Sequence, residues 1–134
     1  MDKDVQYIAP QSPFLPFKSP FVDAAWGNNN DGSSISFHTD CEDISQTKLY
    51  DVSQQIISDL DESKIIYKKY ELFNKNKALR SQVQGLLEGI PTKMEFLIFR
   101  KNKCIYILNY ISIESNFLKN HSVFHNFQKE FKVP

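Results

Sequence analysis

The chain has 134 residues, a length that fits one domain with a single hydrophobic core. Its 16 lysines and arginines balance its 16 aspartates and glutamates, and no long run of one sign compensates, so nucleic acid is not an expected partner. No stretch approaches the roughly 18 apolar residues that a membrane-spanning helix needs, and the charged start MDKDVQYIAP lacks the features of a signal peptide.

Residues 1–20 are rich in proline and in aromatic side chains. The segment contains Pro10, Pro13, Pro16 and Pro20 among Phe14, Leu15 and Phe17. Because proline fixes φ and has no backbone N–H, this spacing predicts neither a helix nor a strand in a ladder. We expect an extended arm or tether here, or alternatively a linker whose phenylalanines pack back on the core, followed by a single α+β domain over residues 21–134.

A β-hairpin is predicted at the start of this domain. Residues 21–27 and 33–39 flank the sequence NNNDG, whose residues favour turns and left-handed backbone conformations. Within the second segment, Ile35 and Phe37 alternate with polar residues, which is typical of a half-buried strand. Cys41 follows the end of this strand.

A helix is predicted over residues 44–60, where the apolar period changes from two to nearly four. Its apolar face contains Leu49, Val52, Ile56 and Leu60. Asp43 and Gln46 have the spacing of a capping box, in which two side chains satisfy free backbone N–H groups at a helix start. The expected length is about four turns.

Four antiparallel strands are predicted next, over residues 65–73, 78–88, 92–100 and 104–112, because short turns separate them. Both faces of these strands carry apolar residues, so both need cover. The first helix covers one face. A C-terminal helix with Phe124, Phe127 and Phe131 on one side covers the other or lies across an end. The predicted fold is therefore α+β, with an antiparallel sheet of about six strands flanked by helices.

The order of hairpin, helix, four-strand meander and C-terminal helix resembles the PsbP-like/Mog-like α+β fold, and especially small bacterial envelope lipoproteins and secreted proteins. The matching features are Trp26, Asp31-Gly32, the strand Ser34-Ile35-Ser36-Phe37, Cys41, the strand start Ala78-Leu79-Arg80, the turn Leu87-Glu88-Gly89-Ile90-Pro91, the strand start Lys103-Cys104-Ile105-Tyr106, and residues 127–133. The resemblance covers residues 21–134, and no catalytic motif is among these features.

Because the family includes photosystem subunits, a Ran-binding transport factor and many envelope proteins, the resemblance implies binding or scaffolding more than chemistry. It implies a non-enzymatic protein of the cell envelope or periplasm, or a secreted one, that binds a protein partner. This envelope or secreted location is expected if Met1 replaces an export or lipid-anchor segment, which would also supply a membrane tether; otherwise the expected location is the cytoplasm. The alternative function is a cytosolic adaptor, an immunity protein or a secretion-chaperone-like binder.

The two cysteines bear on this choice. In the envelope interpretation, Cys41 and Cys104 lie at strand ends and meet if the first hairpin pairs with the last strand. A disulfide over these 63 positions would remove about 4 kcal/mol of unfolded-chain entropy. The alternative is two unrelated buried thiols, which are common in cytosolic proteins.

No catalytic, cofactor-binding or metal-binding residues are predicted. His121 and His125 have the i, i+4 spacing that could present two imidazoles, but a metal would need a third ligand such as His38, so the expectation is histidines that face solvent. The acidic residues Asp40, Glu42 and Asp43 near His38 could serve a hydrolase, but acidic residues before a helix chiefly favour its dipole.

Aromatic and polar side chains near sheet ends are the remaining candidates for contact with a protein partner. The predicted partner-binding residues are Trp26, Asn29, Asn30, Tyr67 and Tyr70, with Tyr106 and Tyr110 as further aromatic candidates. Trp26 ranks first because it precedes a polar loop at an expected sheet end, where binding surfaces are frequent.

Overall fold

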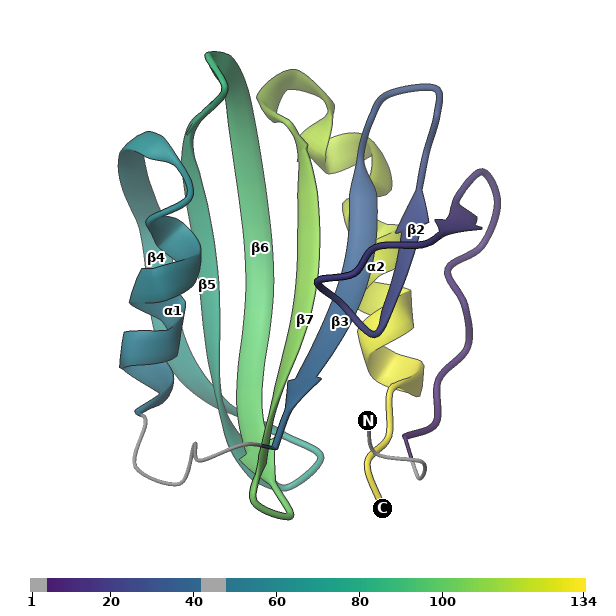
Figure 1. The fold of residues 1–134 in the computed structure, drawn as a ribbon, viewed down its shortest axis with the longest axis vertical. Helices are drawn as coiled ribbons and strands as arrows, with labels where there is room; N and C mark the ends of the chain where they lie inside the picture. The colour runs from purple at the N-terminus through teal and green to yellow at the C-terminus, as the bar shows by residue number, and fades with distance from the viewer. Residues whose placement is uncertain (1–4, 42–47) are drawn as a thin grey trace.

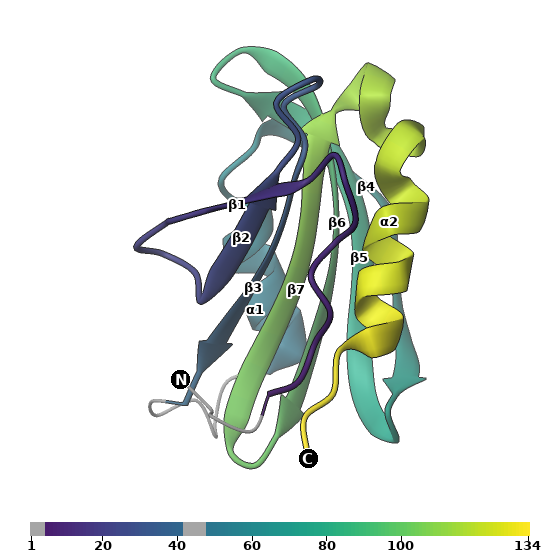
Figure 2. The same cartoon turned by 90° about the vertical axis from the view of Figure 1, so that its right-hand side faces the viewer.

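The computed structural model describes residues 5–41 and 48–134 and shows one antiparallel sheet with a helix on each face (Figures 1 and 2). In chain order, the elements are β1 (Leu15–Phe17), β2 (Ala24–Gly27), β3 (Ser34–Asp40), α1 (Leu49–Ile57), β4 (Asp61–Phe73), β5 (Asn76–Leu87), β6 (Ile90–Lys101), β7 (Cys104–Ile113), the 3-10 turn η1 (Glu114–Asn116) and α2 (Phe117–Glu130). Neither helix is long and apolar enough to cross a lipid bilayer.

The sheet has seven strands in the order β1-β2-β3-β7-β6-β5-β4. The predicted hairpin corresponds to β2 and β3, and the predicted meander corresponds to β4 to β7. The α+β class is confirmed, and the observed seven strands are close to the predicted six. Pairing of β3 with β7 joins the hairpin to the last strand of the meander. Between these two neighbouring strands, the chain forms α1 and the strands β4 to β6.

The seventh strand is β1, which lies in the proline-rich segment where no ladder was predicted. Pro16 lies opposite Trp26 in the pairing of β1 with β2. The prediction failed because β1 is an edge strand, where a residue without an N–H group does not break a ladder on both sides. The same segment packs on the domain elsewhere, since Phe14 is buried and Gln6 forms a two-way backbone bridge with Lys132.

The first helix is shorter than predicted. Lys48 has extended backbone angles and precedes α1, and the helix ends at Ile57, so α1 has nine residues. The predicted capping residues Asp43 and Gln46 lie outside the described residues. The predicted apolar face is nevertheless the one that packs: Val52 is buried, while Leu49 and Ile56 are partly buried against the same cluster.

The two faces of the sheet have separate apolar cores. The core under α1 contains Val52, Ile57, Leu60, Val83, Met94, Phe96, Ile98 and Ile105. The larger core under α2 is mostly aromatic and includes Trp26, Phe37, Phe99, Tyr106, Tyr110, Phe124, Phe127 and Phe131. The predicted phenylalanine stripe of the C-terminal helix is confirmed, and Figure 2 shows α2 lying along its face of the sheet.

A disulfide joins Cys41, just after β3, to Cys104, the first residue of β7. The antiparallel pairing of β3 with β7 places these two strand ends side by side, with Asp40 opposite Ile105. The chain therefore carries a covalent link across the pair of β3 and β7, which connects its N-terminal hairpin to its meander.

Candidate functional site

A row of polar side chains crosses the α2 face of the sheet at the level of Glu95. The strand register places Tyr67 opposite Gln82, Gln82 opposite Glu95, and Glu95 opposite Tyr110. These four residues lie on β4, β5, β6 and β7 in turn, so each strand contributes one member. Because side chains alternate between the faces of a sheet, the whole row points toward α2.

Glu95 is the centre of this row, and its side chain is completely buried. The Tyr67 hydroxyl donates to Oε1 over 3.1 Å, and the Gln82 amide donates to the same oxygen over 3.0 Å. Arg80 Nη1 donates to Oε2 over 3.0 Å. A buried carboxylate without partners would be strongly unfavourable, so these donors are what allow an ionised side chain here.

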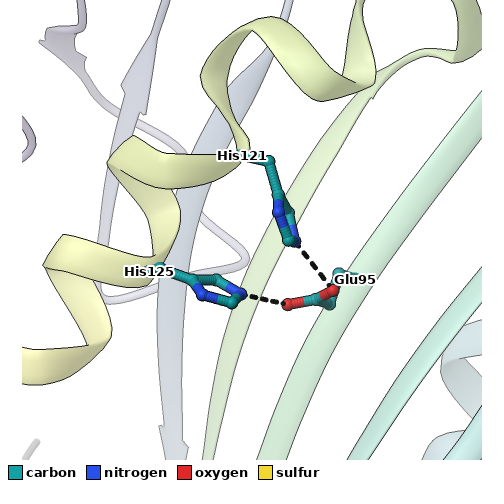
Figure 3. A group of neighbouring side chains, drawn as sticks. All are labelled: Glu95, His121 and His125. Carbon is teal, nitrogen blue, oxygen red and sulfur yellow. Dashed lines mark hydrogen bonds and ion pairs between the residues drawn. The ribbon is translucent and has the colours of Figure 1, made fainter.

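Two histidines of α2 also contact this carboxylate (Figure 3). His121 Nε2 lies 2.9 Å from Oε1 of Glu95, and His125 Nε2 lies 3.2 Å from Oε2. The i, i+4 spacing places both rings on one helix face, with centroids 4.3 Å apart. The expectation that both histidines simply face solvent is therefore wrong: their side chains are 26% and 48% exposed and their Nε2 atoms point into the sheet.

Arg80 connects the centre of the cluster to its rim. Its Nε and Nη2 atoms donate to both oxygens of Glu71 over 2.9 and 3.0 Å, and Nη2 also donates to Gln128 of α2 over 2.9 Å. Two parallel hydrogen bonds between a guanidinium and a carboxylate fix the orientation of both groups. Arg80 thus presents only its Nη1 to Glu95, in a position set by β4 and α2.

The pKa values follow from these contacts. Burial alone would raise the pKa of Glu95, but hydrogen bonds with His121 and Gln82 and the charges of His121 and Arg80 outweigh it and lower the pKa to about 2. Burial, followed by the charge of Glu95 and the hydrogen bond to it, raises the pKa of the Tyr67 hydroxyl to about 12. Burial and the neighbouring His121 lower the pKa of His125. Glu95 is an anion and Tyr67 a neutral donor near neutral pH.

The predicted partner-binding residues are scattered over the molecule. Trp26 is 5% exposed and packs against Tyr7 and Phe127, so the expectation of an open tryptophan is not met. Asn29 and Asn30 are exposed in the turn between β2 and β3, and no described contact brings them near Tyr67 or Tyr70.

The predicted tyrosines divide between the two faces of the sheet. Tyr67 belongs to the Glu95 cluster, whereas Tyr70 is 52% exposed on the α1 side of β4. Tyr106 and Tyr110 are both fully buried in the aromatic core, so they are not open partner-binding side chains.

His38 is not the third member of the histidine cluster. It lies on β3 next to Phe37, whose side chain is in the α2 core, so the ring of His38 points to the opposite face. Its Nδ1 atom is buried and has no hydrogen-bond partner among the described residues. Glu42 and Asp43, the acidic residues proposed beside it, lie outside the described residues.

Glu95, Arg80 and Gln82 were missed as site residues. One signal was present: Glu95 is a single charged residue inside the apolar run from Met94 to Phe99, on the same parity as Leu97 and Phe99. An acidic residue on an inward-facing parity must find partners, and Arg80 and Gln82 have matching parity on the neighbouring predicted strand. The sequence pattern did not contain the strand register that brings these three residues together.

Comparison with known proteins identifies the fold. No protein-family model and no curated protein matches this sequence. Among solved structures, LpqN of Mycobacterium tuberculosis, involved in cell envelope biogenesis, matches with a TM-score of 0.67 and 8% identity, over 96% of this chain and 82% of LpqN.

Two further structures agree. Cyanobacterial PsbP (CyanoP) from Synechocystis matches with a TM-score of 0.65 and 11% identity, over 98% of this chain and 87% of that one. A Pseudomonas aeruginosa protein of unknown function matches with a TM-score of 0.63 and 14% identity, over 100% of this chain and 86% of that one. At these identities the likeness shows a PsbP-like fold, and the predicted fold resemblance is confirmed at that level.

Proposed function

We propose that the protein is a non-enzymatic protein-binding module of the cell envelope, acting outside the cytoplasm. The observation that carries the binding function is the edge strand β4. It ends the strand order, it has 13 residues, and no strand of the described residues pairs with its outer side. An exposed edge of this length presents unpaired N–H and C=O groups, to which an extended segment of another protein can add as a further strand.

The side chains of β4 favour such an addition in its second half. There, Tyr70 and Leu72 are 52% and 76% exposed, whereas the exposed Ile65 and Ile66 precede Tyr67 in the first half. Register shifts between Asp61 and Lys64 and between Ile65 and Tyr67 interrupt the first half, and bulges of this kind discourage strand addition. From Tyr67 to Phe73 the pairing with β5 is regular, so this stretch is the proposed docking edge.

The chemistry of the partner follows from the charge beside this edge. Lys68 lies over the ring of Tyr50, 3.9 Å from its centroid, and Lys77 lies over the ring of Tyr70 at 4.4 Å. A cavity of about 380 Å³ next to Tyr70 is also lined by Lys48 and Lys77. We therefore expect an extended partner segment that alternates apolar residues with aspartate or glutamate.

The location outside the cytoplasm is supported by the disulfide between Cys41 and Cys104, because such bonds persist in oxidising compartments and are rare in the cytosol. LpqN, which shares the fold, is involved in cell envelope biogenesis. The alternative of a cytosolic adaptor requires two free thiols instead.

The binding function is tested by a photo-crosslinking amino acid placed at Leu72 in the native host. The matched control places it at Leu118, which is 82% exposed on α2, far from β4 in the sequence and on another element. We expect one crosslinked partner at Leu72 that is lost when Lys68 and Lys77 are both changed to glutamate. The same adducts at both positions would contradict a docking edge on β4.

The location is tested separately, by trapping thiols during cell lysis and measuring intact mass. We expect Cys41 and Cys104 to resist alkylation in unfolded protein until a reductant is added. Rapid alkylation of both without reductant would contradict the extracytoplasmic location while leaving the β4 experiment unaffected.

A further inference from the structure

We propose that Glu95, His121 and His125 form a binding site for a divalent cation of the Zn²⁺ type, with Nε2 of both histidines and the Glu95 carboxylate as ligands. Neither the partner-binding function nor the fold comparison assigns this site. It lies on the α2 face of the sheet, whereas the proposed docking edge lies on β4 and projects Tyr70 to the α1 face.

The geometry fits such an ion. The three potential ligand atoms lie within 4.8 Å of one another, and the two nitrogen-to-oxygen distances are 2.9 and 3.2 Å. Two ligands that each lie about 2.0 Å from a tetrahedral Zn²⁺ are about 3.3 Å apart. Both observed separations are close to this value, with His121 next to Oε1 and His125 next to Oε2 of the same carboxylate. Because the His125 ring is 48% exposed, water can complete the coordination from the solvent side.

Hydrogen-bond capacity gives an independent argument. Without a cation, five potential donors converge on Glu95: Tyr67, Gln82, Arg80, His121 and His125. An ionised carboxylate has only about four lone-pair sites. Oε1 alone is approached by three of the five. When the ring-nitrogen lone pairs of both imidazoles bind a cation, these two rings no longer donate hydrogen bonds to Glu95. Three donors remain, and the carboxylate can accept all three.

Those three remaining groups are suited to orient a ligand. Carboxylates that bind metals are themselves hydrogen-bonded by an outer layer of residues, which fixes their rotamer. Tyr67, Gln82 and Arg80 do this from β4 and β5. The rotamer of the buried carboxylate is thus set before any ion arrives.

The charge of the cluster also favours a cation. Arg80 is shared between two carboxylates, since it binds Glu71 with two hydrogen bonds and Glu95 with one. With neutral imidazoles, these three side chains carry one net negative charge. Lys69 of β4 faces Glu71 but is exposed to solvent, whereas Glu95 is buried. The uncompensated charge is therefore closest to the histidines, where the ion is placed.

The experiment is titration of the full chain, without a histidine tag and after treatment with a chelator, with ZnSO₄ at pH 7.5 by isothermal calorimetry. A parallel titration with CoCl₂ reads the visible absorption of four-coordinate Co²⁺. We expect one ion per chain. In His121→Gln and His125→Gln, the affinity should fall at least about 100-fold, because groups that merely orient a metal ligand already cost about 10- to 100-fold.

The matched control is His38→Gln, which removes the remaining histidine of the chain from the opposite sheet face and should leave the affinity unchanged. Circular dichroism and thermal unfolding of each variant without metal show whether the fold is kept. The proposal is overturned if Zn²⁺ does not bind one to one, if the double variant His121→Gln/His125→Gln binds as tightly as the parent, or if only His38→Gln weakens binding.

Discussion

The two faces of the sheet bury adjacent residues of one strand in different ways: one face buries apolar side chains, and the other buries a charged one. On β6, Met94 and Phe96 point to the α1 face and pack in an apolar core, whereas Glu95 between them points to the α2 face. At this level the α1 face is stabilised chiefly by burial of apolar area, with Ser81 and Asn109 opposite Phe96 in the strand register. The α2 face combines an aromatic core with a buried carboxylate that depends on several specific donors.

Because of this difference, the α2 face is the more suitable place for a functional site in such a fold. An apolar contact can be replaced by another of similar volume, but a buried carboxylate is retained only if enough hydrogen-bond donors are positioned around it. The partners of Glu95 come from β4, β5 and α2. The complete cluster therefore forms only when all three elements pack correctly against β6. Four predictions test this comparison, from the largest expected effect to the smallest.

Replacement of Phe96 by alanine should break the α1 face. Phe96 is fully buried under α1, and loss of a buried phenylalanine costs about 3–5 kcal/mol in unfolding free energy. Urea unfolding at pH 7 measures this change. The control is Leu87→Ala on β5, where the side chain is 38% exposed and the expected cost is about 1 kcal/mol. A similar small cost for both variants would show that this face is not tightly packed.

The α2 face should lose stability in acid through Glu95. Its pKa is about 2 in the folded protein against 4.5 as the reference, so its contribution is complete above pH 4.5 and is lost as the pH falls toward 2. The total is about 3 kcal/mol. His125 acts in the same direction, because its lowered pKa makes the unfolded chain take up a proton first as the pH falls through 6.5.

Urea unfolding of metal-free protein between pH 7 and pH 3 measures this dependence. In Glu95→Gln, the loss of stability between pH 5 and pH 3 should become shallower than in the parent, although the variant is less stable at pH 7 because Arg80 loses an ionic partner. An unchanged slope would show that other carboxylates, and not Glu95, control the acid sensitivity.

A methyl group at Gly85 should disturb the connection between α1 and β4. An added Cβ would lie 2.8 Å from the backbone oxygen of Asp61 and 3.0 Å from Cβ of Leu60, so the backbone must shift. We expect Gly85→Ala to cost about 1–3 kcal/mol, the usual range for overpacking. In the control Gly27→Ala, the added Cβ would lie 3.3 Å from the ring of Phe17, which can move, and 3.9 Å from the backbone oxygen of Ser33, an ordinary contact. Equal costs measured by thermal unfolding would contradict this account.

Removal of the Tyr67 hydroxyl should have the smallest effect. Because five potential donors approach Glu95 in the metal-free protein, Tyr67→Phe leaves the carboxylate satisfied and should cost less than about 1 kcal/mol in urea unfolding. The matched change Gln82→Leu also removes one donor to Oε1, so a similar small cost is expected. A loss above about 2 kcal/mol for Tyr67→Phe would show that this hydrogen bond is indispensable and that the carboxylate has no excess of donors.

Local patterns were sufficient for most of the elements. Alternation of apolar residues and short polar turns predicted β3 and the four strands of the meander, and a helical stripe of phenylalanines predicted α2. These signals are local because each strand or helix must bury one face, and its neighbours in sequence determine which face that is. The edge strand β1 and the start of α1 escaped prediction, since pairing with β2 overrode the preference of Pro16 and the backbone is still extended at Lys48.

The sequence by itself determined the fold class, the positions of the turns and the amphipathic faces, because these depend on residues within one element. The tertiary structure decided which polar residues meet. Glu95 and His125 are 30 residues apart in the chain, and they are neighbours only because α2 crosses the face of β6 that carries this carboxylate. Strand register and helix docking arise from the packing of the whole core, and no window of sequence contains them.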